Sequence, residues 1–326
     1  MDKTANLPQE RTVVRLQSGN LWPAFPAYGK RYGCVFIFQE GNDDASQQVL
    51  KYEVDIRFVK ELPEKRKRLF RVERISETYI NDYLPDMLID QLACEVGKVF
   101  YPLLIETDYT GTFSGIYNYK EIQERWPAIR EKADRYFKGR KVEKYLNLME
   151  NVLGSKEDLD KMFANDLFFH TYFTSLYQNY TLSFSLQSER LYPVMGKINP
   201  LKFSVEHQLC NELTDYGAIK IVHSGTMIDE RTVRDLEQGE NYPIHKMLYP
   251  YLGPAKGTYK AYYTLNYRTK QIRTIDARWV LELNKQKTVE VKIHQLDLDP
   301  ESKDSIIIEE GVRKKKSGFF STLFGD

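Results

Sequence analysis

Cysteine is scarce in this chain, and its placement argues against two kinds of structural cross-link. Only three cysteines, Cys34, Cys94 and Cys210, occur among 326 residues, and they lie far apart. An odd number at such spacing does not suit a disulfide framework, and no second Cys or His pair joins His207 and Cys210 to make a zinc site. We therefore expect reduced thiols in a cytoplasmic protein that holds no metal and no cofactor.

Long apolar runs are also missing. No window approaches the roughly 18 consecutive apolar residues that a membrane-spanning helix needs. The first residues, MDKTANLPQERTVV, are polar and lack the apolar core and cleavage pattern of a signal peptide. We therefore expect neither a spanning helix nor secretion.

The chain has no excess of charge of either sign. Its 47 Lys and Arg and 46 Asp and Glu give a net charge of +1, which argues against general nucleic-acid binding, because such binding needs surplus cations to displace counterions from phosphates. A hydrophobic content of 42% and a charged content of 29% are typical of a globular protein. The 23 tyrosines suit a broad sheet with one solvated face, because the ring can be buried while the hydroxyl stays wet.

Recognisable catalytic motifs are absent from the sequence. No G-x-G-x-x-G or Walker pattern offers backbone N–H groups to a phosphate. The segment GTFSG, residues 111–115, places Ser114 one position too late for a nucleophile elbow and falls in an expected hairpin. The five histidines are scattered along the chain. We therefore expect a non-enzymatic binding protein, and a hydrolase of unknown class stays as the enzymatic alternative.

Alternating apolar and polar residues predict strands in both the first and the last third of the chain. Residues 48–58 alternate cleanly, with Leu50, Tyr52, Val54, Ile56 and Phe58 on one face. Further strands are expected at 34–39, 69–76, 99–106 and 112–117, then at 182–186, 203–205 and 219–223, and the clearest pattern is a meander over 259–267, 275–283 and 289–293.

A period near four residues predicts helices in between. The first covers 84–96, with Pro85 in its first turn and Gly97 at its exit. A helical block follows over about 118–178, in which Asn118 caps the first helix, Ser155 caps the third, and the third continues to Leu176.

These elements predict an α+β fold. Its mainly antiparallel sheet is built from the N-terminal and C-terminal strands, with the helical block 118–178 packed on one face. We expect a flexible arm at 1–11, a single domain at 12–296 that contains the helical insertion, and a linker and tail at 297–326. Two separate domains are the alternative.

Aromatic residues suggest two places where a ligand could bind. The loop at 18–33 is rich in Gly, Pro and rings, and its Trp22, Phe25 and Tyr28 either plug one end of the core or bind a ligand or partner. A cavity between sheet and helices, lined by residues such as Trp126 and Trp279, is expected if the protein carries a small apolar ligand. Phe169 and Tyr263 are the other residues expected there.

The most distinctive motif is the basic and aromatic C-terminal tail. Its cations are Arg313, Lys314, Lys315 and Lys316, and its apolar residues are Phe319, Phe320, Leu323 and Phe324. The apolar residues share one face of a short helix, which is too short to be stable alone in water. Three partners suit it: the protein's own body, an apolar groove of another protein, or an anionic membrane surface. The favoured hypothesis is an adaptor that holds a protein partner through this tail, and the oligomeric state stays open.

Overall fold

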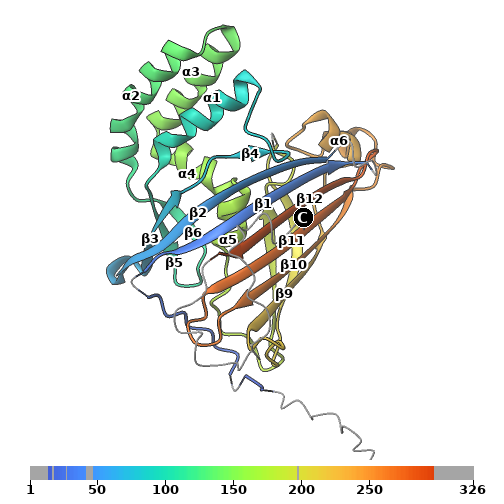
Figure 1. Ribbon diagram of the computed structural model, residues 1–326. Helices are drawn as coiled ribbons and strands as arrows, with labels where there is room; N and C mark the ends of the chain where they lie inside the picture. The colour runs from blue at the N-terminus through green and yellow to red at the C-terminus, as the bar shows by residue number, and fades with distance from the viewer. Residues whose placement is uncertain (1–13, 17, 27, 42–46, 197, 297–326) are drawn as a thin grey trace, which may run out of the picture.

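The computed structural model describes residues 14–16, 18–26, 28–41, 47–196 and 198–296. Within these ranges, twelve strands form one antiparallel sheet in the order β6-β5-β3-β2-β1-β12-β11-β10-β9-β8-β7, and β4 pairs with β2 off this path (Figure 1). The strands are β1 (Lys30–Glu40), β2 (Gln47–Leu62), β3 (Lys67–Arg74), β4 (Tyr79–Ile80), β5 (Leu103–Asp108), β6 (Phe113–Ile116), β7 (Ser185–Tyr192), β8 (Leu201–Leu209), β9 (Ile219–Met227), β10 (Lys256–Leu265), β11 (Ile272–Glu282) and β12 (Lys287–Gln295).

The N-terminal and C-terminal strands share this sheet, as expected, because β1 pairs with both β2 and β12. In the β1–β12 ladder, Cys34 lies opposite Ile293 and Phe36 lies opposite Val291. These four side chains are at most 3% exposed. Apolar side chains therefore exclude solvent from the buried face of the sheet where its two halves join. We call this face the inner face.

Alternation along each strand decides which side chains reach the inner face. In β2, Val54 and Ile56 are buried whereas Arg57 is exposed, since successive side chains point to opposite faces. The basic turn after β2 is a short 3-10 helix, Pro63–Lys65, which ends at Arg66 in the left-handed region with φ of 52°. The alternating pattern in the sequence thus predicts which side chains of β2 lie on the inner face.

Seven helices accompany the sheet in the described part of the chain. They are α1 (Leu88–Gly97), α2 (Tyr119–Tyr136), α3 (Arg140–Gly154), α4 (Lys156–Ala164), α5 (Leu167–Tyr172), α6 (Val233–Gln238) and α7 (Ile244–Leu248). Helix α4 contacts β6, and α5 contacts β11 and β12. Figure 1 shows α1, α2 and α3 stacked together beyond β3, while α5 lies behind the central strands.

Two expected helix boundaries are wrong, and one expected capping hydrogen bond is not made. Helix α1 begins at Leu88 rather than near Pro85, and Met87 occupies its N-cap position. The expected third helix is two helices, because Asp166 accepts hydrogen bonds from the N–H groups of Phe168 and Phe169 and starts α5 anew. Asn118 does not cap α2 with its side chain, which instead bonds the backbone of the segment before β5 and of β5 itself.

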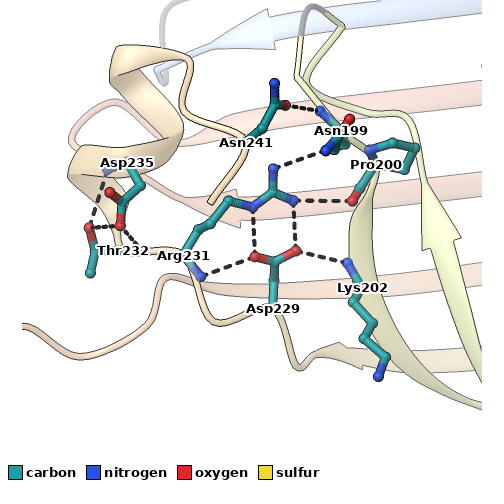
Figure 2. A network of polar contacts seen from close by, with 8 residues as sticks. All are labelled: Asn199, Pro200, Lys202, Asp229, Arg231, Thr232, Asp235 and Asn241. Atoms are coloured by element: carbon teal, nitrogen blue, oxygen red, sulfur yellow. Dashed lines mark hydrogen bonds and ion pairs between the residues drawn. The ribbon is translucent and has the colours of Figure 1, made fainter. Parts of the chain in front are cut away.

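A buried ion pair fixes the segment that connects β9 to β10. Arg231 donates from Nε and Nη2 to the two carboxylate oxygens of Asp229, at 2.8 and 2.7 Å (Figure 2). Its remaining donors reach the carbonyls of Asn199 and Pro200. Both ion-pair side chains are less than 10% exposed, and the hydrogen bonds from Arg231 lower the pKa of Asp229 although burial opposes this. The pair thus ties this segment to the start of β8.

Asp235 organises the rest of the same segment. Its carboxylate accepts from the N–H and hydroxyl of Thr232 and from the N–H of His245 (Figure 2 shows Thr232). Although burial raises the pKa of Asp235, these hydrogen bonds outweigh it and lower the pKa to about 2. The result is a capping box on α6 that also holds the start of α7.

Removing the charge of Asp229 tests how much the buried pair stabilises the fold. Asp229→Asn leaves the Arg231 guanidinium buried without a carboxylate, so we expect a loss of about 3 kcal/mol in the free energy of unfolding. The matched control is Glu189→Gln, which breaks the largely exposed pair with Lys202 and is expected to cost less than about 1 kcal/mol. Urea unfolding measures both, and equal losses would contradict the assignment.

Candidate functional site

A small cavity lies on the inner face where β1, β2, β3 and β5 meet. Its floor includes Tyr32 of β1, Ile56 of β2 and Phe70 of β3, and its walls include Tyr172 and Tyr177 from the end of α5 and the segment after it. The cavity has a volume of about 30 Å³. About 10–15 Å³ of such volume accommodates one water molecule, so the space suits a single small polar group.

Phe25 from the N-terminal loop closes this cavity. Its ring stacks on Phe58 at 5.1 Å between centroids and meets Phe70 edge-on at 5.1 Å. Tyr177 lies 6.3 Å away, also edge-on. The loop therefore positions a ring over the cavity through aromatic contacts of ordinary geometry.

The cation of Arg68 lies beside the same rings. The Arg68 side chain is 4% exposed, and its Nη1 donates to the carbonyl of Tyr109 at 3.0 Å. The guanidinium lies over the rings of Phe25 and Tyr109, at 5.5 and 4.9 Å from their centroids. Glu61 forms an ion pair with Nε of Arg68 at 3.6 Å, a distance that is too long for a hydrogen bond. Arg68 is therefore buried with part of its donor capacity unused.

Three buried polar atoms around the cavity have no hydrogen-bond partner among the described residues. They are Nε of Arg68, Oγ1 of Thr107 and Oε1 of Gln271, and all three residues line the cavity. Thr107 lies opposite Arg68 in the β3–β5 ladder. An unmade hydrogen bond at a buried group costs roughly 1–3 kcal/mol. The cavity thus offers three buried polar atoms with hydrogen-bonding capacity that no described residue uses.

An open hollow of about 570 Å³ shares two lining residues, Phe25 and Phe58, with the cavity. The other residues around it are Arg57, Val59, Arg71 and Leu104. These strand residues alternate with the buried Ile56, Val72 and Leu103, so they lie on the opposite face of the sheet. Two arginines beside apolar side chains suit an amphipathic molecule better than a purely apolar one.

The structure separates the aromatic residues that the sequence suggested for ligand binding. Phe25 and Tyr28 line the cavity, whereas Trp22 is not part of its lining and is 62% exposed. Trp126 and Trp279 are 7% and 1% exposed, and neither lines the cavity or the hollow. Ligand binding by any of the five stays a prediction. Trp279 packs against the rings of Tyr192 and Tyr259, at 5.3 and 4.9 Å between centroids.

The tail that the sequence singled out lies outside the described residues. This applies to Arg313, Lys314, Lys315, Lys316, Phe319, Phe320, Leu323 and Phe324. Its binding to a partner or membrane therefore stays a prediction. No described helix is long and apolar enough to cross a membrane, and the described ranges hold no cluster of three His, Cys, Asp or Glu residues suited to a metal ion.

A second polar cluster lies at the other end of the inner face, on β7 to β10. Ser188 Oγ is 2.7 Å from Nε2 of His207, and His207 Nδ1 is 2.9 Å from Nε2 of His223. Nδ1 of His223 lies 3.5 Å from the hydroxyl of Tyr259, and that hydroxyl lies 3.5 Å from the hydroxyl of Tyr263. We call these five residues the Ser188 chain.

Sequence reasoning missed the Ser188 chain because its histidines are far apart in the chain. His207 and His223 are directly opposite each other in the β8–β9 ladder. The signal was present: His207 follows Phe203 and Val205 on the buried face of an alternating strand. Only the pairing of β8 with β9 shows that two inward histidines meet.

Comparisons with known proteins do not identify the chain. No family model matches it, and no curated protein matches it. A solved structure titled "Lipid-protein interactions in lipovitellin" aligns over 90% of this chain at 9% identity, with a TM-score of 0.39. The alignment spans 27% of the length of that structure's chain. A likeness at this level carries no argument about function.

The buried histidines predict a loss of stability in mild acid. Burial lowers the pKa of His207 to about 4, and burial and His207 hold the pKa of His223 well below its ordinary value. Their neutral forms therefore stabilise the fold fully above the unfolded pKa near 6.5, and this stabilisation is lost as pH falls toward 4. Between pH 6 and 5, we expect His207 to contribute a slope approaching 1.4 kcal/mol per pH unit.

Urea unfolding from pH 7 to 5 measures this slope. His207→Gln removes one titrating group, so its free energy of unfolding is expected to depend less steeply on pH than that of the wild type. Parallel pH profiles for the two proteins would contradict the assignment.

Proposed function

We propose that this chain is a non-enzymatic binding protein that holds a small amphipathic molecule at the cavity beneath Phe25. The observation that carries the proposal is a set of three buried polar atoms without a hydrogen-bond partner, on Arg68, Thr107 and Gln271, beside a cavity lined mainly by rings. A purely structural core would replace such groups by apolar ones, because unpaired buried polar atoms destabilise the fold.

The donor and acceptor capacities of these three atoms indicate which polar group a ligand must present. Arg68 Nε can only donate a hydrogen bond, Gln271 Oε1 can only accept one, and the Thr107 hydroxyl can do both. A primary amide, a carboxylic acid or a hydroxyl satisfies a set of this kind. The cavity of about 30 Å³ admits the polar end alone, so the apolar body would have to leave the cavity past the ring of Phe25.

Octanamide and its N,N-dimethyl derivative test the proposal. They have the same chain, but only the primary amide can donate a hydrogen bond to Gln271. We expect calorimetry to show saturable octanamide binding that is about tenfold weaker for the dimethyl compound, because one lost hydrogen bond at a buried site costs about 1–3 kcal/mol. Gln271→Leu is expected to abolish this preference.

Thr107→Val separates binding from folding. It removes a hydroxyl that has no described partner, so the free energy of unfolding is expected to stay level or rise by up to about 1 kcal/mol while octanamide binding weakens. The matched control is Thr171→Val in α5, since the Thr171 hydroxyl is also buried and unpartnered but does not line the cavity. Equal octanamide binding by wild type and Thr107→Val would contradict the proposal, as would a soaked crystal with only water there.

The C-terminal tail carries a separate proposal that rests on its sequence. Four cations followed by apolar residues at i, i+1, i+4 and i+5 form a short amphipathic segment, and we propose that it holds a protein partner in the cytoplasm. An anionic membrane surface and the protein's own body are the competing partners.

Truncation after Gly311 distinguishes these partners. The adaptor proposal expects the full chain to retain a specific partner that the truncated chain loses, with unchanged cooperative melting of both. Loss of flotation with phosphatidylserine vesicles would instead support the membrane. A lower melting temperature without any change in binding would assign the tail to its own body and contradict the adaptor proposal.

A further inference from the structure

Arg190 is a half-buried cation on the inner face of β7, which is an edge strand of the sheet. Its Nε donates to Ser188 Oγ at 3.3 Å. No carboxylate among the described residues lies within ion-pair distance of its guanidinium, and its two Nη groups have no described hydrogen bond. A partly buried charge without a counter-charge is costly, so its retention calls for a ligand or partner.

The described groups that act electrostatically with Arg190 are titratable side chains without a negative charge. Burial lowers the pKa values of His170, His207 and His223, and Arg190 lowers them further. Burial raises the pKa values of Tyr180, Tyr192 and Tyr263, and Arg190 opposes that rise. These six groups carry no charge at neutral pH, because burial favours their neutral forms. The guanidinium therefore faces a polar but uncharged wall.

The direction of the Ser188 chain follows from its far end. The carbonyl of Thr171 can only accept, so Tyr263 donates to it, at 3.4 Å. Tyr259 then donates to Tyr263. Each neutral imidazole donates from Nδ1 and accepts at Nε2, so His223 donates to Tyr259 and His207 donates to His223. Ser188 consequently donates its proton to His207 and accepts from Arg190.

This geometry resembles a serine activated by a histidine, but its charges are wrong for nucleophilic catalysis. A general base must carry the serine's proton as an imidazolium, and a carboxylate normally stabilises that cation. Here the second ring is the neutral His223, and Arg190 opposes a positive charge on His207. The cluster therefore suits the binding of a negative group rather than attack by Ser188.

We propose that Arg190, with Ser188 fixed by His207, forms a binding site for a small oxyanion of the carboxylate or phosphate class. The planar guanidinium presents two parallel N–H donors to such a group, which is the geometry that carboxylates and phosphates share. Because Arg190 lies on the edge strand β7, an anion can reach it from solvent at that edge of the sheet. The site is separate from the cavity beneath Phe25 and does not depend on the function proposed for that cavity.

Thermal melting at pH 7 in phosphate, acetate or chloride of equal ionic strength tests this site. We expect phosphate at about ten times its Kd to raise the melting temperature of the wild type by roughly 2 °C relative to chloride. Acetate distinguishes carboxylate from phosphate selectivity. Arg190→Met is expected to lose the anion-dependent shift and to melt no lower than the wild type in chloride, because it removes an unpaired cation.

Two further variants keep the test decisive. Arg190→Lys retains the charge without the planar fork, and we expect calorimetry to show about tenfold weaker phosphate binding. Arg135→Met removes an exposed arginine that pairs with Glu131 on α2, and it should leave the anion-dependent shift unchanged. Equal anion-dependent shifts in Arg190→Met and the wild type, or in Arg190→Lys and the wild type, would overturn the proposal, as would the absence of any shift in the wild type.

Discussion

The pairing of β1 with β12 is the constraint on which the rest of this structure depends. It joins strands that lie more than 200 residues apart, and through them it joins the β6–β1 half of the sheet to the β12–β7 half. Both halves then present their apolar side chains to one continuous inner face. Because loop closure over such a distance is costly, the buried side chains along this ladder must stabilise it strongly.

Helix α5 connects the two polar regions of that face. Tyr172 at its end lines the cavity beneath Phe25 and packs edge-on against Tyr32 at 5.1 Å. The preceding carbonyl, of Thr171, accepts the last hydrogen bond of the Ser188 chain. A change in the position of α5 would therefore affect both regions.

Much of the sheet could be predicted from the sequence, because alternation reports directly on burial. Residues 48–58 and the meander after 259 follow period two, and they form β2 and β10 to β12. The break at Asp166 was missed because the apolar stripe runs on through Phe163 and Phe169. A stripe records which face is buried, whereas a cap is a local competition for backbone hydrogen bonds.

The polar sites could be predicted less well, for a different reason. The loop containing Phe25 and Tyr28 was recognised as aromatic, but Arg68, Thr107 and Gln271 come from three other segments. Nothing in the sequence near any of them marks an unpartnered atom. Unsatisfied hydrogen bonds are a property of the assembled structure, so neither this cavity nor the meeting of His207 with His223 could be read from spacing.

The central claim is that the inner face retains buried polar groups for binding at a cost in stability. The most direct measurement is the free energy of unfolding in urea of the triple variant Thr107→Val, Gln271→Leu and Arg190→Met, without added ligand. We predict a variant at least as stable as the wild type, since each change removes a polar group that lacks a full set of partners. A loss of several kcal/mol would show that these groups hold the fold together, and it would contradict the account.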